Sequence, residues 1–294
     1  MNIDTHVHTR FSPDSWSEIP EILAAAKRRG LDAIAITDHD TLDGYRAAVR
    51  ERSDDDVRII PGVERTISAG QYGIHIIGLY VESLPSAESL EATISDVKEQ
   101  GGRVIIPHPY RRGTGLLYHL EEGNVAEEAV ADAFEAADYV ELINWKDPNP
   151  TILRTIDFLR ETAYPVVAGS DSHVPETVGS VFTHFASSDL RGPSRACAHV
   201  RGTYADVRDV GPHLVGHDRS PRTEGAKRRL KTLVASVLNL IPGPEPNRTL
   251  KRLKYHAGKR RRRSTIESQM DQCWLVELRL DRESNTIVTE APET

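Results

Sequence analysis

The sequence has only two cysteines, Cys197 and Cys273, among its 294 residues. They stand in unrelated surroundings, so nothing indicates a disulfide framework or a zinc site made of thiolates. We therefore predict a cytoplasmic protein. Long apolar runs are also missing. None approaches the roughly 20 residues that cross a bilayer, so we expect no transmembrane segment.

The N-terminal segment lacks the positively charged stretch and the apolar stretch that characterise a secretory signal peptide. It contains two closely spaced histidines, His6 and His8, which belong to the set of residues described below. Cleavage of a leader would remove both of them. We therefore expect no cleaved signal peptide.

Acidic residues outnumber basic ones, and the formal net charge is −7 at pH 7. The imbalance differs along the chain. Residues 1–200 carry 18 Lys and Arg against 32 Asp and Glu, whereas residues 201–294 carry 19 against 12. Within 219–263 there are 15 basic and two acidic residues. An acidic body with a basic C-terminal extension requires its own explanation.

Short runs rich in Val and Ile alternate with helical stripes from residue 1 to about residue 190. The spacing predicts helices around 19–26, 90–97 and 152–159. Strands are expected at 1–7, 33–37, 57–63, 73–79, 103–107 and 165–169. This alternation predicts an α/β domain with parallel strands. Segment 112–130 is less regular, and we expect a flap beside the site.

The character of the sequence changes near Gly192. We expect one domain over 1–190, followed by a second region over 191–294 made of a linker, a basic amphipathic helix and a terminal hairpin. Within the second region, 194–200 is predicted to be a short helix, and the apolar residues of 230–241 recur at helical spacing. Strands at 273–280 and 286–289 would form the hairpin.

Nine potential metal ligands lie at the ends of the apolar segments of the first 173 residues. They are His6, His8, Asp14, His39, Glu64, His75, His108, Asp171 and His173. Parallel strands that end on one face of a barrel would bring such side chains together. One divalent ion takes about four to six ligands, so nine suit two or three ions that share a bridging carboxylate. Glu64 is the natural bridge, because it is the only glutamate of the set.

These residues stand in motifs that resemble the PHP (polymerase and histidinol phosphatase) family. The motifs are Asp-Thr-His-Val-His-Thr followed by Ser-Pro-Asp-Ser, Ile-Thr-Asp-His-Asp, Pro-Gly-Val-Glu, His-Ile-Ile-Gly-Leu, Pro-His-Pro and Gly-Ser-Asp-Ser-His. The resemblance covers about residues 1–190. It implies a distorted (β/α)7 barrel, here with a basic C-terminal extension, that holds up to three metals.

The resemblance also implies how the ligands are shared. His6, His8, Glu64 and Asp171 would hold one metal. Glu64, His75 and His108 would hold the second, and Asp14, His39 and His173 the third. One feature departs from the relatives that cleave nucleoside 3′,5′-bisphosphates or digest RNA from the 5′ end. They carry a helical insertion between the histidines matched by His75 and His108, and this chain has room there for only about one helix and one strand.

Clustered divalent ions activate a water and neutralise phosphate charge, so the set predicts a metal-dependent phosphoesterase. The ions would be Mn, Zn or Fe, which mixed imidazole and carboxylate sites accept. Asp171 or a nearby histidine would carry the proton. Arg111 and Arg112 are candidate phosphate clamps, because guanidinium matches phosphate oxygens. Amide hydrolysis in a binuclear barrel normally uses a lysine, and no lysine stands at the end of an expected strand.

The substrate stays open at this stage. A nucleotide or a short nucleic acid is the first candidate, and a small phosphomonoester such as histidinol phosphate is the second. A third hypothesis is a metal-stabilised scaffold without catalytic activity, in which the basic tail carries the function by binding polyanions. Residues 219–263 would bind nucleic acid or an anionic membrane without sequence specificity, through their positive charge.

Overall fold

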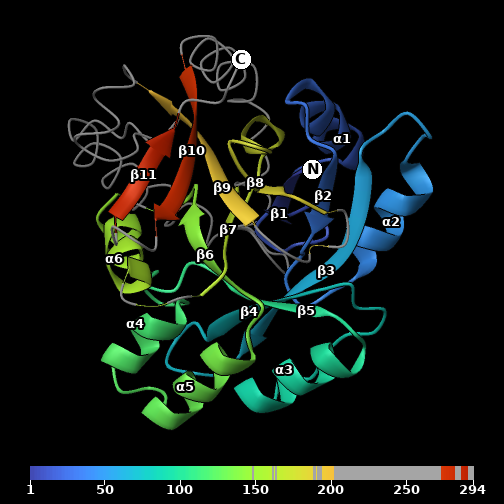
Figure 1. The fold of residues 1–294 in the computed structure, drawn as a ribbon. Helices are drawn as coiled ribbons and strands as arrows, with labels where there is room; N and C mark the ends of the chain where they lie inside the picture. Colours follow the sequence, from blue (N-terminus) through green and yellow to red (C-terminus); the bar gives the residue numbers. More distant parts are fainter. Residues whose placement is uncertain are drawn as a thin grey trace, which may run out of the picture.

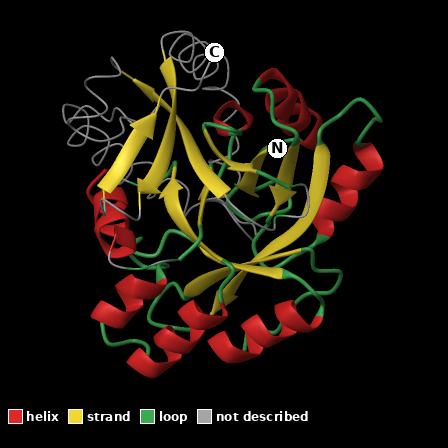
Figure 2. Ribbon diagram, in the orientation of Figure 1, coloured by secondary structure: helices red, strands yellow, loops and turns green. Residues whose placement is uncertain are grey.

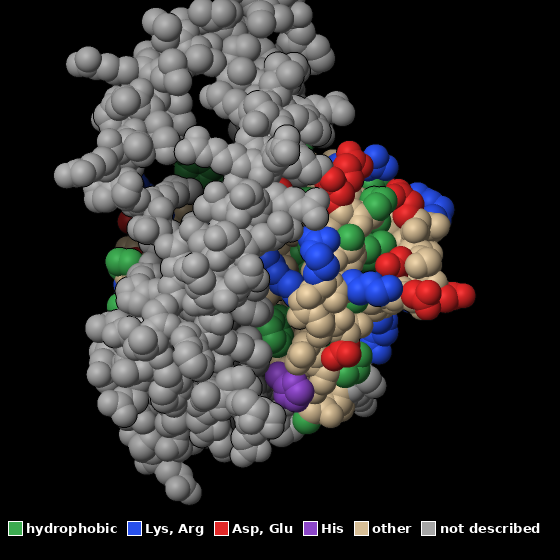
Figure 3. All heavy atoms as spheres, turned by 90° about the horizontal axis from the view of Figure 1, so that it is seen from above, with side chains coloured by type: hydrophobic (Ala, Val, Ile, Leu, Met, Phe, Trp, Pro, Cys, Tyr) green, Lys and Arg blue, Asp and Glu red, His purple; other side chains and the backbone are tan. Residues whose placement is uncertain are grey.

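The computed structural model describes residues 1–147, 149–160, 162, 164–187, 190, 194–201, 273–281 and 286–290. The basic segment 219–263 and the helix expected at 230–241 lie outside these residues. On the face seen in Figure 3, acidic and basic side chains of the described part lie next to one another. No helix of the described residues is long and apolar enough to cross a membrane.

A ring of strands forms the centre of the molecule (Figure 1). In chain order they are β1 (Asn2–Val7), β2 (Ala33–Ile36), β3 (Arg58–Ile67), β4 (Ile74–Leu79), β5 (Arg103–Ile106), β6 (Tyr139–Asn144) and β7 (Val166–Gly169). Each pairs with the next in the sequence. The ring closes beyond β7, where the His8 amide donates to the Ser172 carbonyl at 2.9 Å. The distorted barrel that the family resemblance implied is confirmed.

Helices surround the strands on the outside (Figure 2). They are α1 (Ile19–Arg28), α2 (Asp43–Glu51), α3 (Leu90–Glu99), α4 (Leu116–Glu121), α5 (Glu127–Ala136) and α6 (Asn149–Arg160), with a short 3₁₀ turn, η1 (Pro175–Thr177). The three helices expected from apolar spacing correspond to α1, α3 and α6. Ser89 is the N-cap of α3, and its side chain accepts a hydrogen bond from the Ala92 amide at 3.0 Å.

The prediction that all strands run parallel was wrong for β4. This strand pairs antiparallel with both β3 and β5. Only six residues separate β3 from β4, too few for the helical crossover that a parallel pair needs. His75 therefore lies near the start of its strand instead of at the end. The reversed direction still brings it beside β3, where Thr66 is its partner in the ladder.

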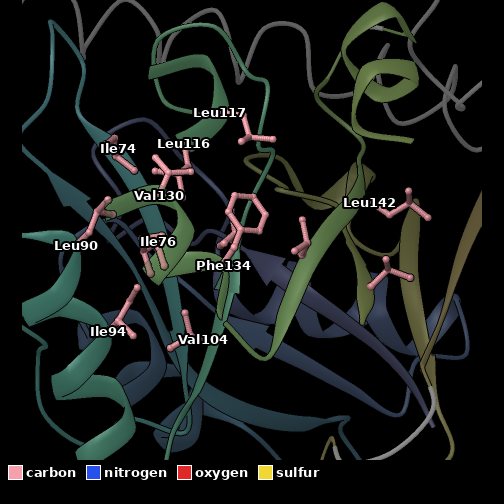
Figure 4. Packing of buried hydrophobic residues seen from close by; sticks show 14 of the residues in the cluster. Ile74, Ile76, Leu90, Ile94, Val104, Leu116, Leu117, Val130, Phe134 and Leu142 are labelled. Carbon is pink, nitrogen blue, oxygen red and sulfur yellow. The ribbon is translucent and has the colours of Figure 1, made fainter. Parts of the chain in front are cut away.

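Segment 112–130 does not form a flap. Most of it folds into α4 and the first part of α5, and Leu116, Leu117 and Val130 are buried in the main hydrophobic cluster. Figure 4 shows these side chains together with Phe134 and with residues of α3, β4 and β5. The glycines suggested an irregular loop, but apolar residues of this segment are buried in the hydrophobic core.

Phe134 supplies a large part of this packing, and its loss should destabilise the barrel. Its ring is 3% exposed and lies 5.2 Å from the rings of both Phe158 and Tyr164. Phe134→Ala should lower the free energy of unfolding by about 3–5 kcal/mol. Chemical denaturation measures the change, with Leu153→Ala on the exposed side of α6 as control. A loss below about 1 kcal/mol would contradict this account of the core.

The sheet continues from β1 on its other edge. There β8 (Val181–Phe185) pairs antiparallel with β1, followed by β9 (Ser194–Arg201), β10 (Cys273–Asp281) and β11 (Thr286–Glu290). The prediction of a short helix at 194–200 was wrong, because β8 and β10 pair with this segment on both sides. β10 and β11 pair antiparallel with each other, the arrangement expected for the terminal hairpin.

Candidate metal centre

The nine predicted ligands form one connected cluster. His6 and His8 are two residues apart at the end of β1, so both side chains lie on the same face. His39 follows β2 and forms an isolated parallel bridge with Glu64 of β3. His75 lies on β4, on the side of the hairpin that also carries Glu64.

The remaining members come from loops. Asp14 lies between β1 and α1, and His108 follows β5. Asp171 and His173 follow β7. Segments far apart in sequence therefore contribute to the same cluster.

Glu64 lies at the centre of the cluster, and its two carboxylate oxygens face different histidines. Oε1 is 2.8 Å from His75 Nδ1 and 3.0 Å from His108 Nε2. Oε2 is 3.3 Å from His6 Nε2 and 3.2 Å from His8 Nε2. The side chain is 1% exposed. A carboxylate with this arrangement can serve two cations at once.

Asp171 completes the group around Oε2 of Glu64. Its Oδ1 atom lies 3.3 Å from His8 Nε2 and 3.6 Å from His6 Nε2. A third group lies beside it, where Asp14 Oδ2 is 2.8 Å from His173 Nε2 and 3.8 Å from His39 Nε2. Each of the three implied ligand sets has members that lie close together, but His39 also lies close to Glu64, with Nδ1 3.2 Å from Oε2.

The spacing of the donor atoms fits bound cations. Ligand atoms about 2.1 Å from one ion lie about 3.0–3.4 Å from each other. The His6 and His8 Nε2 atoms are 3.0 Å apart, and their distances to Glu64 and Asp171 are similar. In addition, Asp14 Oδ1 is buried without a hydrogen-bond partner among the described residues. Buried polar atoms usually have one, and an ion would supply it.

Neighbouring positive groups lower the pKa of both Glu64 and Asp171. Burial raises the pKa of Glu64, but His75, His6 and His39 lower it more, so this pKa lies well below its usual range. Burial also raises the pKa of Asp171, and Lys146, His6 and Arg111 lower it more, again well below the usual range. Anionic oxygens beside imidazoles are a donor set that divalent transition metals accept.

Two of the nine residues have a backbone conformation that side chains rarely adopt. The φ angle is 32° at His108 and 48° at Asp171. Such strain is held only where surrounding contacts impose it, and it is common at functional sites. Here Glu141 Oε2 accepts from the His108 amide at 2.8 Å. On the other loop, Asp4 Oδ1 accepts from the Ser170 amide at 3.0 Å.

Glu141 was missed by the sequence reasoning, because β6 was missed. Its carboxylate is 1% exposed, and Oε1 lies 3.1 Å from His6 Nδ1. It also accepts a hydrogen bond from Asn144 at 2.9 Å. A carboxylate behind a ligating imidazole fixes the ring and its tautomer. A glutamate inside the apolar run 139–143 was the signal that could have revealed this residue.

Glu141→Ala should lower metal affinity or activity by about 10–100-fold, the usual effect of removing a group that supports a ligand. Glu141→Gln keeps an oxygen for the His6 ring or the His108 amide, and should lose less. Metal titration and steady-state kinetics measure both variants. If Glu141→Ala binds metal and turns over like the unmodified protein, Glu141 does not orient the site.

Arg111 and Arg112, the candidate phosphate clamps, lie in different environments. Arg111 donates from Nε to Asp147 Oδ1 at 2.6 Å, and its two terminal nitrogens donate to Asp171 and Asn144, each at 2.5 Å. This guanidinium already holds three protein acceptors. Arg112 is exposed. Neighbours along the sequence therefore have different environments, which the sequence alone did not reveal.

The prediction that no lysine stands at a strand end was also wrong. Lys146 lies two residues beyond β6, and its Nζ atom is 3.4 Å from Asp171 Oδ1. It escaped notice because β6 was not among the expected strands. The position between the ligand groups is nevertheless occupied by the Glu64 carboxylate. The lysine therefore gives no support to the rival amide chemistry.

Comparison with known proteins identifies the family. Residues 4–143 match the PHP domain and residues 153–196 match the PHP-associated region. An uncharacterized protein of Methanocaldococcus jannaschii is 38% identical over 121 residues, which are 37% of this chain and 68% of that protein. The chain belongs to the PHP family. Its relatives include proteins named probable phosphatases.

Other PHP relatives cover more of the chain. The 3′,5′-nucleoside bisphosphate phosphatase of Chromobacterium violaceum is 31% identical over 217 residues, 73% of this chain and 63% of that enzyme. A probable phosphatase of Shewanella piezotolerans is 28% identical over 201 residues, 60% of this chain and 80% of that protein.

A solved structure shows the same fold. It is a two-domain protein from Bacteroides vulgatus, described as containing a predicted PHP-like metal-dependent phosphoesterase. It has a TM-score of 0.53 at 17% identity, covering 67% of this chain and 64% of that one.

Proposed function

We propose that this PHP protein hydrolyses a phosphate ester with a water activated by two or three divalent ions, which would be Mn, Zn or Fe. The observation that carries the proposal is the arrangement around Glu64, whose two carboxylate oxygens lie 2.8–3.3 Å from nitrogens of different histidines. Paired ions lower the pKa of a bound water from 15.7 toward about 7 and neutralise charge on the phosphate.

The protein's own residues would have distinct roles in this site. His6, His8, Asp171 and Glu64 would hold the first ion, and His75 and His108 would hold the second together with Glu64. Asp14, His39 and His173 would hold a third. Asp171 or a nearby histidine would carry the proton.

A nucleotide or a short nucleic acid is the substrate class we favour. The similarity to a 3′,5′-nucleoside bisphosphate phosphatase over 73% of the chain supports it. The match spans 63% of that enzyme, so its full activity is not transferred. One feature speaks against this class. His75 and His108 are separated only by the rest of β4, α3 and β5, without the helical insertion of the relatives that act on such substrates.

A small phosphorylated metabolite is the second candidate, and the short connection between His75 and His108 favours it. A metal-loaded screen over mononucleotides, 3′,5′-bisphosphates, short oligonucleotides and histidinol phosphate separates the two classes. The protein should hydrolyse at least one of them. Binding of metal without hydrolysis of any phosphoester would sink the proposal and favour the non-catalytic scaffold.

Residues 219–263 and the cytoplasmic location remain predictions. Binding of nucleic acid or anionic vesicles by the full chain, compared with a variant in which the four arginines 260–263 are replaced by glutamine, tests the role of the basic segment. Such binding should weaken steeply as salt concentration increases.

A further inference from the structure

Lys146 is a positive side chain beside the ligand cluster that the roles above do not use. Its Nζ atom lies 3.4 Å from Asp171 Oδ1 and 3.3–3.4 Å from the two ring nitrogens of His173. The backbone amide of Lys146 donates to Asn144 Oδ1 at 2.9 Å, which fixes the loop just beyond β6. The side chain is 36% exposed, so it touches both the site and solvent.

Its neighbour Arg111 is poorly suited to meet a phosphate. Asp147, Asn144 and Asp171 hold that guanidinium from three directions, and the Arg111 side chain is only 19% exposed. Contact with a substrate would require it to leave buried carboxylates without their partner, which is costly. Arg111 therefore fixes Asp171, and the more exposed ammonium of Lys146 is left to meet an incoming anion.

The position of Lys146 depends on the charge of Asp171. Nζ lies near Oδ1, the same oxygen that faces His6 and His8. A cation bound to this oxygen would weaken its attraction for the ammonium. A lysine side chain is a flexible stem with three rotatable donors, so it can turn from Asp171 to a new anion without movement of the backbone.

We propose that Lys146 binds a non-bridging oxygen of the substrate phosphate and holds the ester against the metal cluster. This inference rests on the proposed phosphoesterase function and names the residue that receives the phosphate. Lysine binds phosphate as a point charge, which suits a terminal phosphate group presented in different orientations. The alternative is that Lys146 only balances the negative charge of Asp171.

Lys146→Met and Lys146→Gln test the proposal with inorganic phosphate as the probe. Lys98→Met is the matched control, because Lys98 is 37% exposed and also pairs with a carboxylate, Asp138 at 2.7 Å, but lies on α3 outside the site. Metal-loaded protein is used for phosphate binding and for steady-state kinetics. Metal content per chain and thermal unfolding are measured in parallel.

Both Lys146 variants should bind phosphate about 10–100-fold more weakly and show a higher KM, as expected when a charged hydrogen bond is lost. Their metal content should equal that of the unmodified protein and of Lys98→Met. Unchanged phosphate binding, or loss of metal from both Lys146 variants, would overturn the proposal.

The outcome also separates this inference from the proposed function. If the unmodified protein hydrolyses a phosphomonoester and the Lys146 variants bind phosphate normally, only the inference is wrong. If it hydrolyses nothing but binds phosphate through Lys146, the inference holds and the catalytic assignment is wrong. If it neither hydrolyses esters nor binds phosphate, both are wrong.

Discussion

Glu64→Gln should reduce hydrolysis by about a thousandfold or more, well beyond the 10–100-fold expected for a residue that only supports a ligand. The carboxylate presents Oε1 to His75 and His108, and Oε2 to His6 and His8. An amide has one oxygen, and its nitrogen cannot bind a cation. The substitution therefore removes an anionic ligand from two groups while keeping the shape of the side chain.

Metal content and activity measured together test this bridge. Glu64→Gln should hold fewer divalent ions per chain and lose its turnover, while thermal unfolding still reports a folded barrel. Glu176→Gln is the control, because Glu176 is also a buried glutamate but lies on η1 outside the cluster. If Glu64→Gln retains both metal and activity, Glu64 does not bridge two ions, and the division of the site described above is wrong.

The ligand cluster was the part that could be predicted from sequence most fully. Imidazole and carboxylate side chains at the ends of apolar runs are chemically unlike their surroundings, and the folded chain brings all nine together. Glu64 was selected as the bridge because it was the only glutamate of the set. Its contacts with His75 and His108 on one side and with His6 and His8 on the other fit that role.

Residues that support the ligands were harder to predict, since their partners are distant in the sequence. Arg111 contacts Asp147, which is 36 residues away, and Asn144, which is 33 residues away. The neighbouring sequence does not distinguish a buried arginine that pairs with carboxylates from an arginine that binds a substrate phosphate. The polar residues Glu141 and Asn144 also interrupted the apolar pattern of β6, so the strand and the lysine that follows it were both overlooked.

The direction of β4 shows a second limit of reasoning from patterns. An apolar run reads the same in both directions, so the sequence identified His75 as a ligand but assigned its strand the wrong orientation. The short connection from β3 was the available signal, because only a hairpin can join two paired strands with so few residues. A histidine at the start of an antiparallel strand reaches the same place as one at the end of a parallel strand.

Asp171→Ala should abolish measurable hydrolysis, whereas Asp147→Ala should retain most of it. Both carboxylates pair with Arg111, at 2.5 Å and 2.6 Å, and both are almost fully buried. Only Asp171 also faces the histidines, with Oδ1 3.3 Å from His8 and 3.6 Å from His6. The two variants therefore remove the same kind of partner from Arg111, but only one removes a ligand.

This difference separates a role in the metal site from a role in holding the loop. Each variant leaves Arg111 with one carboxylate fewer, so a similar loss of thermal stability is expected in both. Metal content should fall only in Asp171→Ala, and kcat/KM should fall there by about a thousandfold or more, as for the loss of a ligand rather than of its support. Equal losses of activity in the two variants would mean that Asp171 acts through Arg111 alone, as a structural partner and not as a ligand.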